Sequence, residues 1–386
     1  MTPAPLSVIG HWTSVIRHSA PRRGRLLAVL LACLVGTVAP ALAEPSAPPL
    51  PVLPAQASFS EPGYHVWCGA PIAGDDGRYH LLYSRWPAAA TFAPGWALRS
   101  EIAHAVADTP LGPYRPTGVV LPARGLNPAT GEKFWDADVA HNPNVLRLPD
   151  GRFALFYTGN HGDGTSFATH RNHQRIGVAL AARPEGPWTR LDHPVLDVGP
   201  RPEDFDSLCV TNPAAAVAPD GSILLLYKAV TQEAGKPLGG RVRHGVARAT
   251  RVEGPYEKLA TDVFAGEGAD NKTWMLVEDP FIWWDAHDRT WHGLGRDVAG
   301  RYTGDRGAIA RFVSTDGLRW RPAARPLFVP GAYPLAAGGR STARLERPAL
   351  LFVADRPAVF FGAANGYAPP PGLSYNVQFP LAPVSP

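Results

Sequence analysis

Hydrophobic residues recur along the chain in short runs separated by turn residues. In the first such unit Asp76-Gly77 precedes an apolar run at 79–83, and a second run at 102–106 leads to Gly112-Pro113-Tyr114. Asp-Gly between two apolar runs is typical of a β-hairpin, because its tight turn needs residues that accept a positive φ. No helical period is sustained over three turns, so these runs predict antiparallel strands.

The same unit recurs five times, and the prolines that open its copies lie about 70 residues apart. The prolines are Pro71, Pro143, Pro213, Pro280 and Pro348. The apolar runs of the later copies are 153–157, 176–180, 223–227, 245–249, 308–313, 350–353 and 359–361. A β-sandwich needs no such period, whereas radial repetition of small sheets does. The pattern therefore predicts an all-β fold, a five-bladed β-propeller. We expect residues 57–64 to close the ring by pairing with the last blade.

The first 43 residues follow a different pattern. Arg22, Arg23 and Arg25 precede an apolar run at 26–38, and Ala41-Leu42-Ala43 follows it. This order is typical of a secretory signal, and the run is shorter than the roughly 20 residues of a membrane-spanning helix. We expect a signal peptide over 1–43, a Pro-rich linker over 44–56 and the propeller over 57–386. The protein would then be periplasmic or secreted, with no integral membrane span after cleavage.

Charge and cysteine content exclude two classes of function. Residues 1–43 hold four arginines and no acidic residue, so 33 basic residues face 33 acidic ones in the rest of the chain. This balance leaves no electrostatic case for binding nucleic acid. Only Cys68 and Cys209 remain after residue 43, which predicts neither a disulfide framework nor a thiolate metal cluster.

Polar residues stand just before the repeated prolines. In a propeller the first strand of each blade lines the central channel, so these residues should converge on one axial cavity. Polar groups at strand starts are costly in a core and are better explained by an accessible cavity. The residues expected there are Trp67, Cys68, Asp136, His141, Asn142, Asp206, Thr211, Asn212, Glu278, Asp279, Glu346 and Arg347.

Carboxyl groups among these residues suggest hydrolysis of a glycosidic bond, which needs one acid and one base or nucleophile. Glu278 and Asp279 are the best candidates, and Asp136 or Asp206 could supply the opposing carboxylate. Because neighbouring side chains of a strand point to opposite faces, we expect only one of Glu278 and Asp279 to face the cavity.

The blade pattern resembles the five-bladed glycoside hydrolases of family 43 and its relatives. The resemblance lies in Trp67-Cys68-Gly69, residues 76–80, Ser100-Glu101-Ile102, His141-Asn142-Pro143 and Val277-Glu278-Asp279-Pro280, and it covers essentially the whole chain after residue 43. It implies a hydrolase acting on a plant or bacterial polysaccharide or oligosaccharide. We expect a carbohydrate partner and no cofactor or catalytic metal, although a structural axial ion such as calcium could be present.

The chain departs from that family at its three catalytic positions. The resemblance places a general-base Asp where this chain has Trp67-Cys68-Gly69-Ala70. It places a second Asp at Asn142 and a general-acid Glu at Thr211-Asn212. None of the three carboxyl groups transfers by position, so the catalytic pair must be arranged differently here.

Other polar residues allow both a binding and a structural interpretation. His141 could ligate an ion, hold a substrate hydroxyl, or be an internally satisfied histidine. Asn142 and Asn212 could bind substrate or cap turns. Lys228 and Arg347 could bind the carboxylate of an acidic sugar or neutralise Glu346. The substrate-binding candidates are Trp67, for stacking, and Glu101, His141, Asn142, Asn212, Lys228, Glu346 and Arg347.

Two further functions remain open on the same scaffold. One is a polysaccharide lyase, with His141 or a tyrosine as base and Arg347 or Lys228 neutralising a uronate. The other is a propeller that binds sugar without catalysis, which the missing family carboxylates favour.

Overall fold

The computed structural model describes residues 58–269, 273–331, 344–365 and 373–381. All of them belong to one compact unit, Pro49–Pro386. The predicted signal peptide (1–43) and linker (44–56) lie outside the described residues. Within the described residues, no helix has the length and apolar character needed to cross a membrane.

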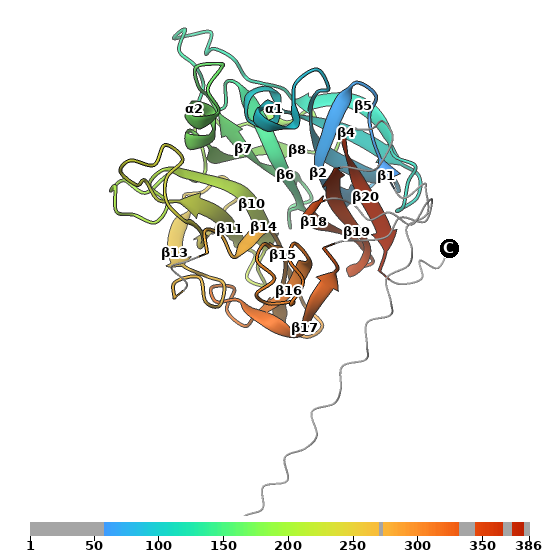
Figure 1. The fold of residues 1–386 in the computed structure, drawn as a ribbon. Coiled ribbons are helices and arrows are strands. Elements are labelled where there is room, and N and C mark those ends of the chain that lie inside the picture. The colour runs from blue at the N-terminus through green and yellow to red at the C-terminus, as the bar shows by residue number, and fades with distance from the viewer. Residues whose placement is uncertain (1–57, 270–272, 332–343, 366–372, 382–386) are drawn as a thin grey trace, which may run out of the picture. The chain divides into compact units, whose positions relative to one another are not determined.

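Five four-stranded antiparallel sheets surround a common axis as the blades of a propeller (Figure 1). The first blade comprises β2 (Tyr64–Ala73), β3 (Tyr79–Pro87), β4 (Glu101–Ala107) and β5 (Arg115–Leu121), and the second β6 (Val139–Arg147), β7 (Phe153–Asn160), β8 (Arg175–Ala181) and β9 (Thr189–Arg190). The third comprises β10 (Cys209–Val217), β11 (Ile223–Val230), β12 (Val242–Ala249) and β13 (Glu257–Thr261), and the fourth β14 (Val277–Asp285), β15 (Thr290–Asp297), β16 (Ile309–Ser314) and β17 (Arg321–Val329). The fifth comprises β18 (Arg344–Val353), β19 (Arg356–Asn365), β20 (Ser374–Pro380) and β1 (Ser58–Phe59). The predicted fold class is confirmed.

The ring closes through its N-terminal strand. Ser58 and Phe59 of β1 pair with Val377 and Asn376 of β20, so the fifth blade combines both ends of the described chain. Phe59 is buried and packs edge-to-face on Tyr83 of the first blade, with 4.8 Å between ring centroids. The predicted closure is confirmed, and among the described residues 58–64 only these two pair with the last blade.

The hydrophobic core lies between adjacent blades. Between the third and fourth blades, for example, Leu224 of β11 packs in one cluster with Trp291 of β15 and Phe312 of β16. Each sheet buries one face against each neighbour, which explains why many strands read as continuous apolar runs.

The Gly-Pro-aromatic motif forms the same turn in three blades. Gly112, Gly186 and Gly254 have φ values of 92°, 92° and 91°, which favour glycine. The aromatic side chain two residues later donates a hydrogen bond back to a carbonyl four residues before it, as Tyr114 Oη does to Pro110 O at 3.0 Å. Trp188 and Tyr256 repeat this contact. The motif therefore fixes the step from the third strand to the fourth.

Each innermost strand carries a β-bulge where it meets the axis. In four blades the bulge is a residue followed by proline, such as Asn142-Pro143. In the first blade it is Cys68-Gly69. The sequence-based equivalence of Pro71 with the other four prolines is therefore wrong by two residues, because Gly69 takes the place of proline there.

Candidate active site

The bulge residues surround the propeller axis and are here called the axial ring, and hydrogen bonds link them in a row from the first blade to the fifth: Cys68, Asn142, Asn212, Asp279 and Arg347. Cys68 Sγ donates to Asn142 Oδ1 at 2.9 Å, and Asn142 Nδ2 donates to Asn212 Oδ1 at 2.7 Å. Asn212 Nδ2 and Arg347 Nη1 both donate to Asp279 Oδ1, the latter at 3.2 Å. All five residues have φ between 50° and 55°, a left-handed conformation that costs energy in residues other than glycine. These contacts help to stabilise it.

A cavity of about 470 Å³ lies over the axial ring. Its wall includes the residue just before each bulge residue: Trp67, His141, Thr211, Glu278 and Glu346. Asp279 lines it as well, so the prediction that only one of Glu278 and Asp279 would face the cavity is wrong. The left-handed bulge at Asp279 breaks the simple alternation of side chains along β14, which brings both carboxyl groups to the cavity.

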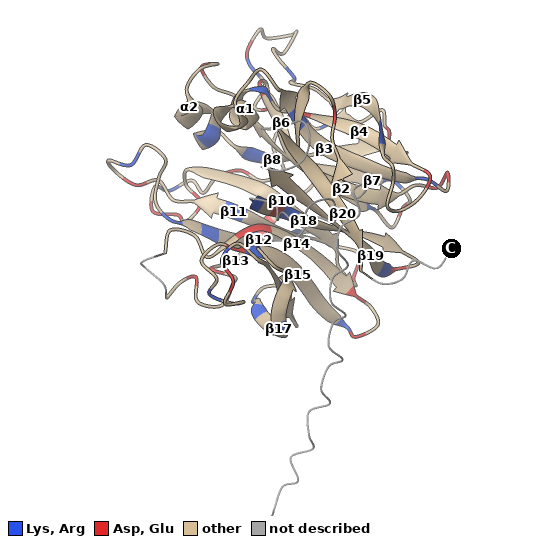
Figure 2. Ribbon diagram, turned by 45° about the vertical axis from the view of Figure 1, so that its right-hand side comes forward, with Lys and Arg blue, Asp and Glu red and all other residues tan. Residues whose placement is uncertain are grey.

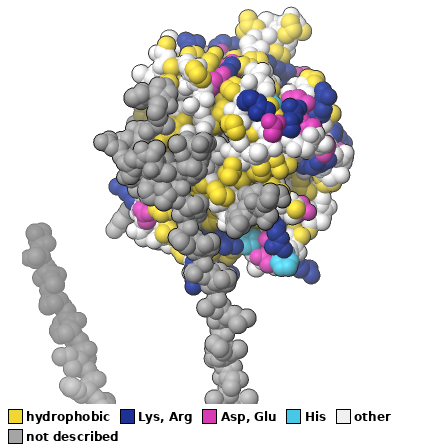
Figure 3. Space-filling model, turned by 90° about the vertical axis from the view of Figure 1, so that its right-hand side faces the viewer, with side chains coloured by type: hydrophobic (Ala, Val, Ile, Leu, Met, Phe, Trp, Pro, Cys, Tyr) yellow, Lys and Arg dark blue, Asp and Glu magenta, His cyan; other side chains and the backbone are white. Residues whose placement is uncertain are grey.

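Three carboxyl groups meet on one side of the cavity. Glu278, Asp279 and Glu346 each offer an oxygen that lies within 4.8 Å of the other two. Figure 2 shows acidic and basic residues gathered where β10, β14 and β18 meet. Figure 3 shows another face of the molecule, on which hydrophobic, basic and acidic side chains are instead interspersed.

Arginine and lysine side chains hold these carboxyl groups in place. Glu278 pairs with Lys228 Nζ at 3.3 Å and with Arg296 Nη1 at 3.0 Å. The same Arg296 nitrogen lies 3.0 Å from Glu346, and Arg344 Nε lies 3.4 Å from it. Lys228 and Arg296 are equivalent positions, each opposite the residue that precedes a bulge.

The protonation preferences of two of these carboxyl groups differ. Burial raises the pKa of Glu346 to about 7, and the nearby charges of Glu278 and Asp279 add to this effect. Burial also opposes the charge of Asp279, but Arg347 and Lys228 outweigh it and lower the pKa of Asp279. The site thus keeps one carboxyl group that can carry a proton near neutral pH beside one that is ionised.

Aromatic side chains form the opposite side of the cavity. Phe92 and Trp96 lie on α1 (Phe92–Arg99), and Phe167 lies on α2 (Phe167–Asn172). Trp96 packs edge-to-face on Phe167 and stacks on His141, each with 5.5 Å between ring centroids. Such a surface suits the apolar face of a sugar ring.

His141 faces the cavity as a neutral imidazole. Burial, reinforced by the charge of Arg347, lowers the pKa of His141 to about 3. Its Nδ1 lies 2.7 Å from the buried Ser100 Oγ, which leaves Nε2 as the atom for a substrate hydroxyl.

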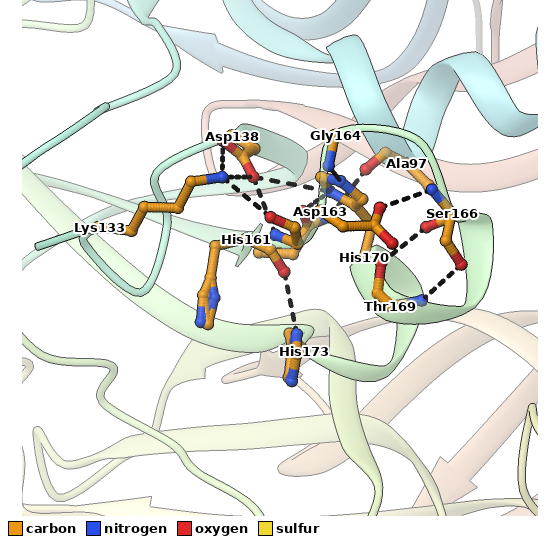
Figure 4. A network of polar contacts seen from close by, with 12 residues as sticks. Ala97, Lys133, Asp138, His161, Asp163, Gly164, Ser166, Thr169, His170 and His173 are labelled. Carbon is orange, nitrogen blue, oxygen red and sulfur yellow. Dashed lines mark hydrogen bonds and ion pairs between the residues drawn. The ribbon is translucent and has the colours of Figure 1, made fainter.

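A network of polar contacts holds α2 against the cavity (Figure 4). Asp138 accepts hydrogen bonds from Lys133 Nζ at 2.9 Å and from Gly162 N at 2.8 Å. His170 lies 3.0 Å from Asn160 Oδ1 and accepts a bond from Gly164 N at 2.9 Å. Ser166 caps the helix. The network fixes the helix that carries Phe167 and Arg171 into the cavity wall.

Asp136 and Asp206 lie away from the cavity, so the prediction that they line it is wrong. Asp136 accepts hydrogen bonds from Tyr157 Oη at 2.7 Å and Arg190 Nη1 at 2.9 Å. Asp206 accepts one from Tyr227 Oη at 3.1 Å and pairs with Lys258 at 2.6 Å.

A third acid repeats this arrangement in the first blade, where Tyr83 Oη donates to Glu61 and Arg85 pairs with it. The acid before each of these three blades therefore joins a tyrosine of the second strand to a cation. This acid recurs because it stabilises the blade, and it does not belong to the axial cavity.

Of the remaining predicted residues, one lies outside the cavity and the others line it. Glu101 is absent from the cavity wall and pairs with Arg85 at 3.0 Å, which is the structural alternative. The structure brings together Trp67, His141, Asn142, Asn212, Lys228, Glu278, Asp279, Glu346 and Arg347 around the cavity.

Several cavity residues were missed by sequence reasoning: Phe92, Phe167, Arg171, Arg296, Arg306 and Arg344. Arg296 could have been found, because aligning the second strands of the blades places it with Lys228. Arg171 and Arg306 lie in connections that differ from blade to blade, so the repeat offers no signal for them.

The axial carboxyl groups fit a calcium ion poorly. Calcium favours a shell of six to eight oxygen ligands, but here Lys228, Arg296 and Arg347 pair with the oxygens that would bind it. A second group with metal-ligand spacing, Asp285, Asp288 and His292, lies near the β14–β15 hairpin of the fourth blade.

No protein-family model matches the chain, and no curated protein matches it. Among solved structures the chain is similar to Zg3597, a family 117 glycoside hydrolase produced by the marine bacterium Zobellia galactanivorans, with a TM-score of 0.58 and 18% identity over 87% of this chain and 91% of that one. It is also similar to a thermostable family-43 glycoside hydrolase, with a TM-score of 0.54 and 13% identity over 83% and 92%. A GH43_1 enzyme from Xanthomonas citri has a TM-score of 0.52 and 14% identity over 86% and 91%. These likenesses show that the chain shares its fold with glycoside hydrolases of families 43 and 117.

Proposed function

We propose that the protein is a glycoside hydrolase that cleaves an O-glycosidic bond in the axial cavity. One observation carries this proposal: Glu346, with its raised pKa, lies beside the ion-paired Glu278 in a cavity walled by aromatic rings. Glycosidases need such a pair of carboxyl groups, and the fold is one that glycoside hydrolases use. The predicted leader over 1–43 supports action on an extracellular or periplasmic carbohydrate.

Glu346 acts as general acid in this mechanism. Its proton passes to the glycosidic oxygen as the carbon–oxygen bond breaks, which removes the need to expel an alkoxide. Glu278 attacks the anomeric carbon on the face of the sugar ring that points away from the leaving group. The reaction retains the anomeric configuration, as the short separation of the two carboxyl groups favours. A water molecule then attacks the anomeric carbon, the bond from that carbon to Glu278 breaks, and Glu346 takes up the proton that the water loses. Asp279 is a positioning residue that anchors Arg347 and adds to the negative potential around Glu346.

Product release by isosteric variants tests the proposal. Glu346→Gln and Glu278→Gln should each lower the rate of release of reducing sugar from a polysaccharide panel by about 10²- to 10⁴-fold. Glu101→Gln is the matched control, because Glu101 lies outside the cavity, and its rate should stay near that of the wild type. If both cavity variants release sugar at the wild-type rate, the assignment is wrong. If wild-type protein binds sugars and releases none, the chain is a binding propeller.

A polysaccharide lyase is the second candidate, and the cations around the cavity favour it because they could neutralise a uronate. Elimination leaves a carbon–carbon double bond in the product, which absorbs ultraviolet light, whereas hydrolysis does not. One absorbance measurement during turnover separates the two reactions.

A further inference from the structure

Positive charge exceeds negative charge on the cavity wall. Six arginine or lysine side chains line it against three carboxyl groups. Four of the six pair with those carboxyl groups: Lys228, Arg296, Arg344 and Arg347. Arg171 and Arg306 form no ion pair with an acidic side chain anywhere in the described part of the chain. A neutral sugar gives no reason for this surplus, whereas an anionic one does.

Arg171 is held in position at the cavity. It lies on α2, is half-buried, and donates through Nη1 to Leu238 O at 2.7 Å and to Asn172 Oδ1 at 3.3 Å. The polar network of Figure 4 fixes the same helix. Its guanidinium therefore reaches the cavity with donors still available and with little conformational freedom left to lose on binding.

Arg306 reaches the cavity from the connection between β15 and β16 in the fourth blade. The buried Asp297 orders this connection by accepting hydrogen bonds from Tyr302 N at 2.8 Å and Thr303 N at 2.9 Å. Gly307 N also donates to Asp297 O at 2.7 Å. Arg306 itself is exposed, so it offers a solvated charge on an ordered loop.

We propose that the carbohydrate bound in this cavity carries anionic substituents, carboxylates or sulfates, that pair with Arg171 and with Arg306. The inference rests on the proposed function and narrows its substrate class. Guanidinium groups pair with planar or tetrahedral oxyanions through two parallel hydrogen bonds.

Binding of matched sugars by wild-type protein tests this inference without any need for turnover. The probes are an oligogalacturonate, the galactose oligomer of the same length, and a galactose oligomer carrying 6-sulfate, titrated calorimetrically at low ionic strength. We expect at least one anionic probe to bind roughly tenfold more tightly than the neutral one, with the preference shrinking as salt is added. The arm that binds identifies carboxylate or sulfate as the group recognised.

The variants are Arg171→Gln with Arg306→Gln, Arg306→Gln alone, and the control Arg183→Gln, whose side chain is exposed outside the cavity. The double variant should bind anionic and neutral probes equally, and Arg306→Gln should lose part of the preference even if loss of the Arg171 contacts loosens α2. The control should keep it. Equal binding of all three probes by wild-type protein, or an unchanged preference in the variants, overturns the inference.

These outcomes are distinguishable from failure of the proposed function. Hydrolysis of neutral glycosides with no anionic preference would sink this inference and leave the hydrolase intact. Selective binding of an anionic sugar without product release would do the reverse.

Discussion

Glu278 and Glu346 occupy the same place in neighbouring blades, one residue before the bulge, yet their surroundings differ. Glu278 lies between Lys228 and Arg296, so two cations balance its charge. Glu346 is more deeply buried, and the two other carboxyl groups face it. A single strand position thus supplies a carboxyl group held by two cations in one blade and a proton donor in the next, because burial and the neighbouring carboxyl groups raise the pKa of Glu346.

The pH dependence of activity should report this difference. Because Glu346 must be protonated to act and its pKa is about 7, kcat/KM should fall as the pH rises above 7. Arg344 lowers the pKa of Glu346. Arg344→Gln should therefore move this fall to higher pH, while Arg183→Gln should leave it in place. If the fall in kcat/KM stays at the same pH or moves to lower pH in the Arg344 variant, the titrating group is not Glu346.

At the scale of elements, two short segments outside the repeat complete the molecule: β1 closes the ring, and α2 completes the cavity. Neither would be stable alone, since β1 has two residues and α2 has six. Both depend on side chains docked against the blades, Phe59 for β1 and the Asp138 network for α2.

Truncation of Phe59 should weaken the closure of the propeller. The ring is buried between the first and last blades, so Phe59→Ala should lower the free energy of unfolding by about 3 kcal/mol in urea denaturation. Ser58→Ala alters an exposed side chain on the same strand and should change it by less than about 0.5 kcal/mol. Equal stability of the two variants would mean that backbone pairing, not the aromatic side chain, holds β1.

At the scale of the whole molecule, the five-fold period and its turn residues are sufficient to predict the fold. Strand alternation and Asp-Gly turns are local signals, and their regular spacing leaves few architectures open. The axial wall is predictable for the same reason, since the blade alignment places Glu278, Glu346 and His141 together.

What the period cannot predict is local geometry and irregular connections. The residue types of Cys68, Asn142 and Arg347 do not predict that they share a left-handed bulge, because that conformation is imposed where the blades meet. Asp136 follows the period as faithfully as Glu278 does, so repetition alone cannot separate a blade contact from an axial one.

The stability of the whole propeller should depend on pH because carboxyl groups lie close together at its axis. Glu346 has a folded-state pKa of about 7, above its ordinary value of 4.5. The folded protein therefore binds this proton more tightly than the unfolded chain does, and the contribution of Glu346 to stability falls as the pH rises from about 4.5 to about 7. Glu346→Gln removes the titration and keeps the shape of the side chain. The melting temperature of the variant relative to wild type should thus increase between pH 4.5 and pH 7 and level off above it, as measured by calorimetry at constant ionic strength. Glu101→Gln, altered at a carboxyl group outside the cavity, should lack this rise. If the melting temperature of the Glu346 variant relative to wild type instead decreases over the same interval, the cations around Glu346 outweigh the effect of burial. Glu346 would then enter the reaction ionised.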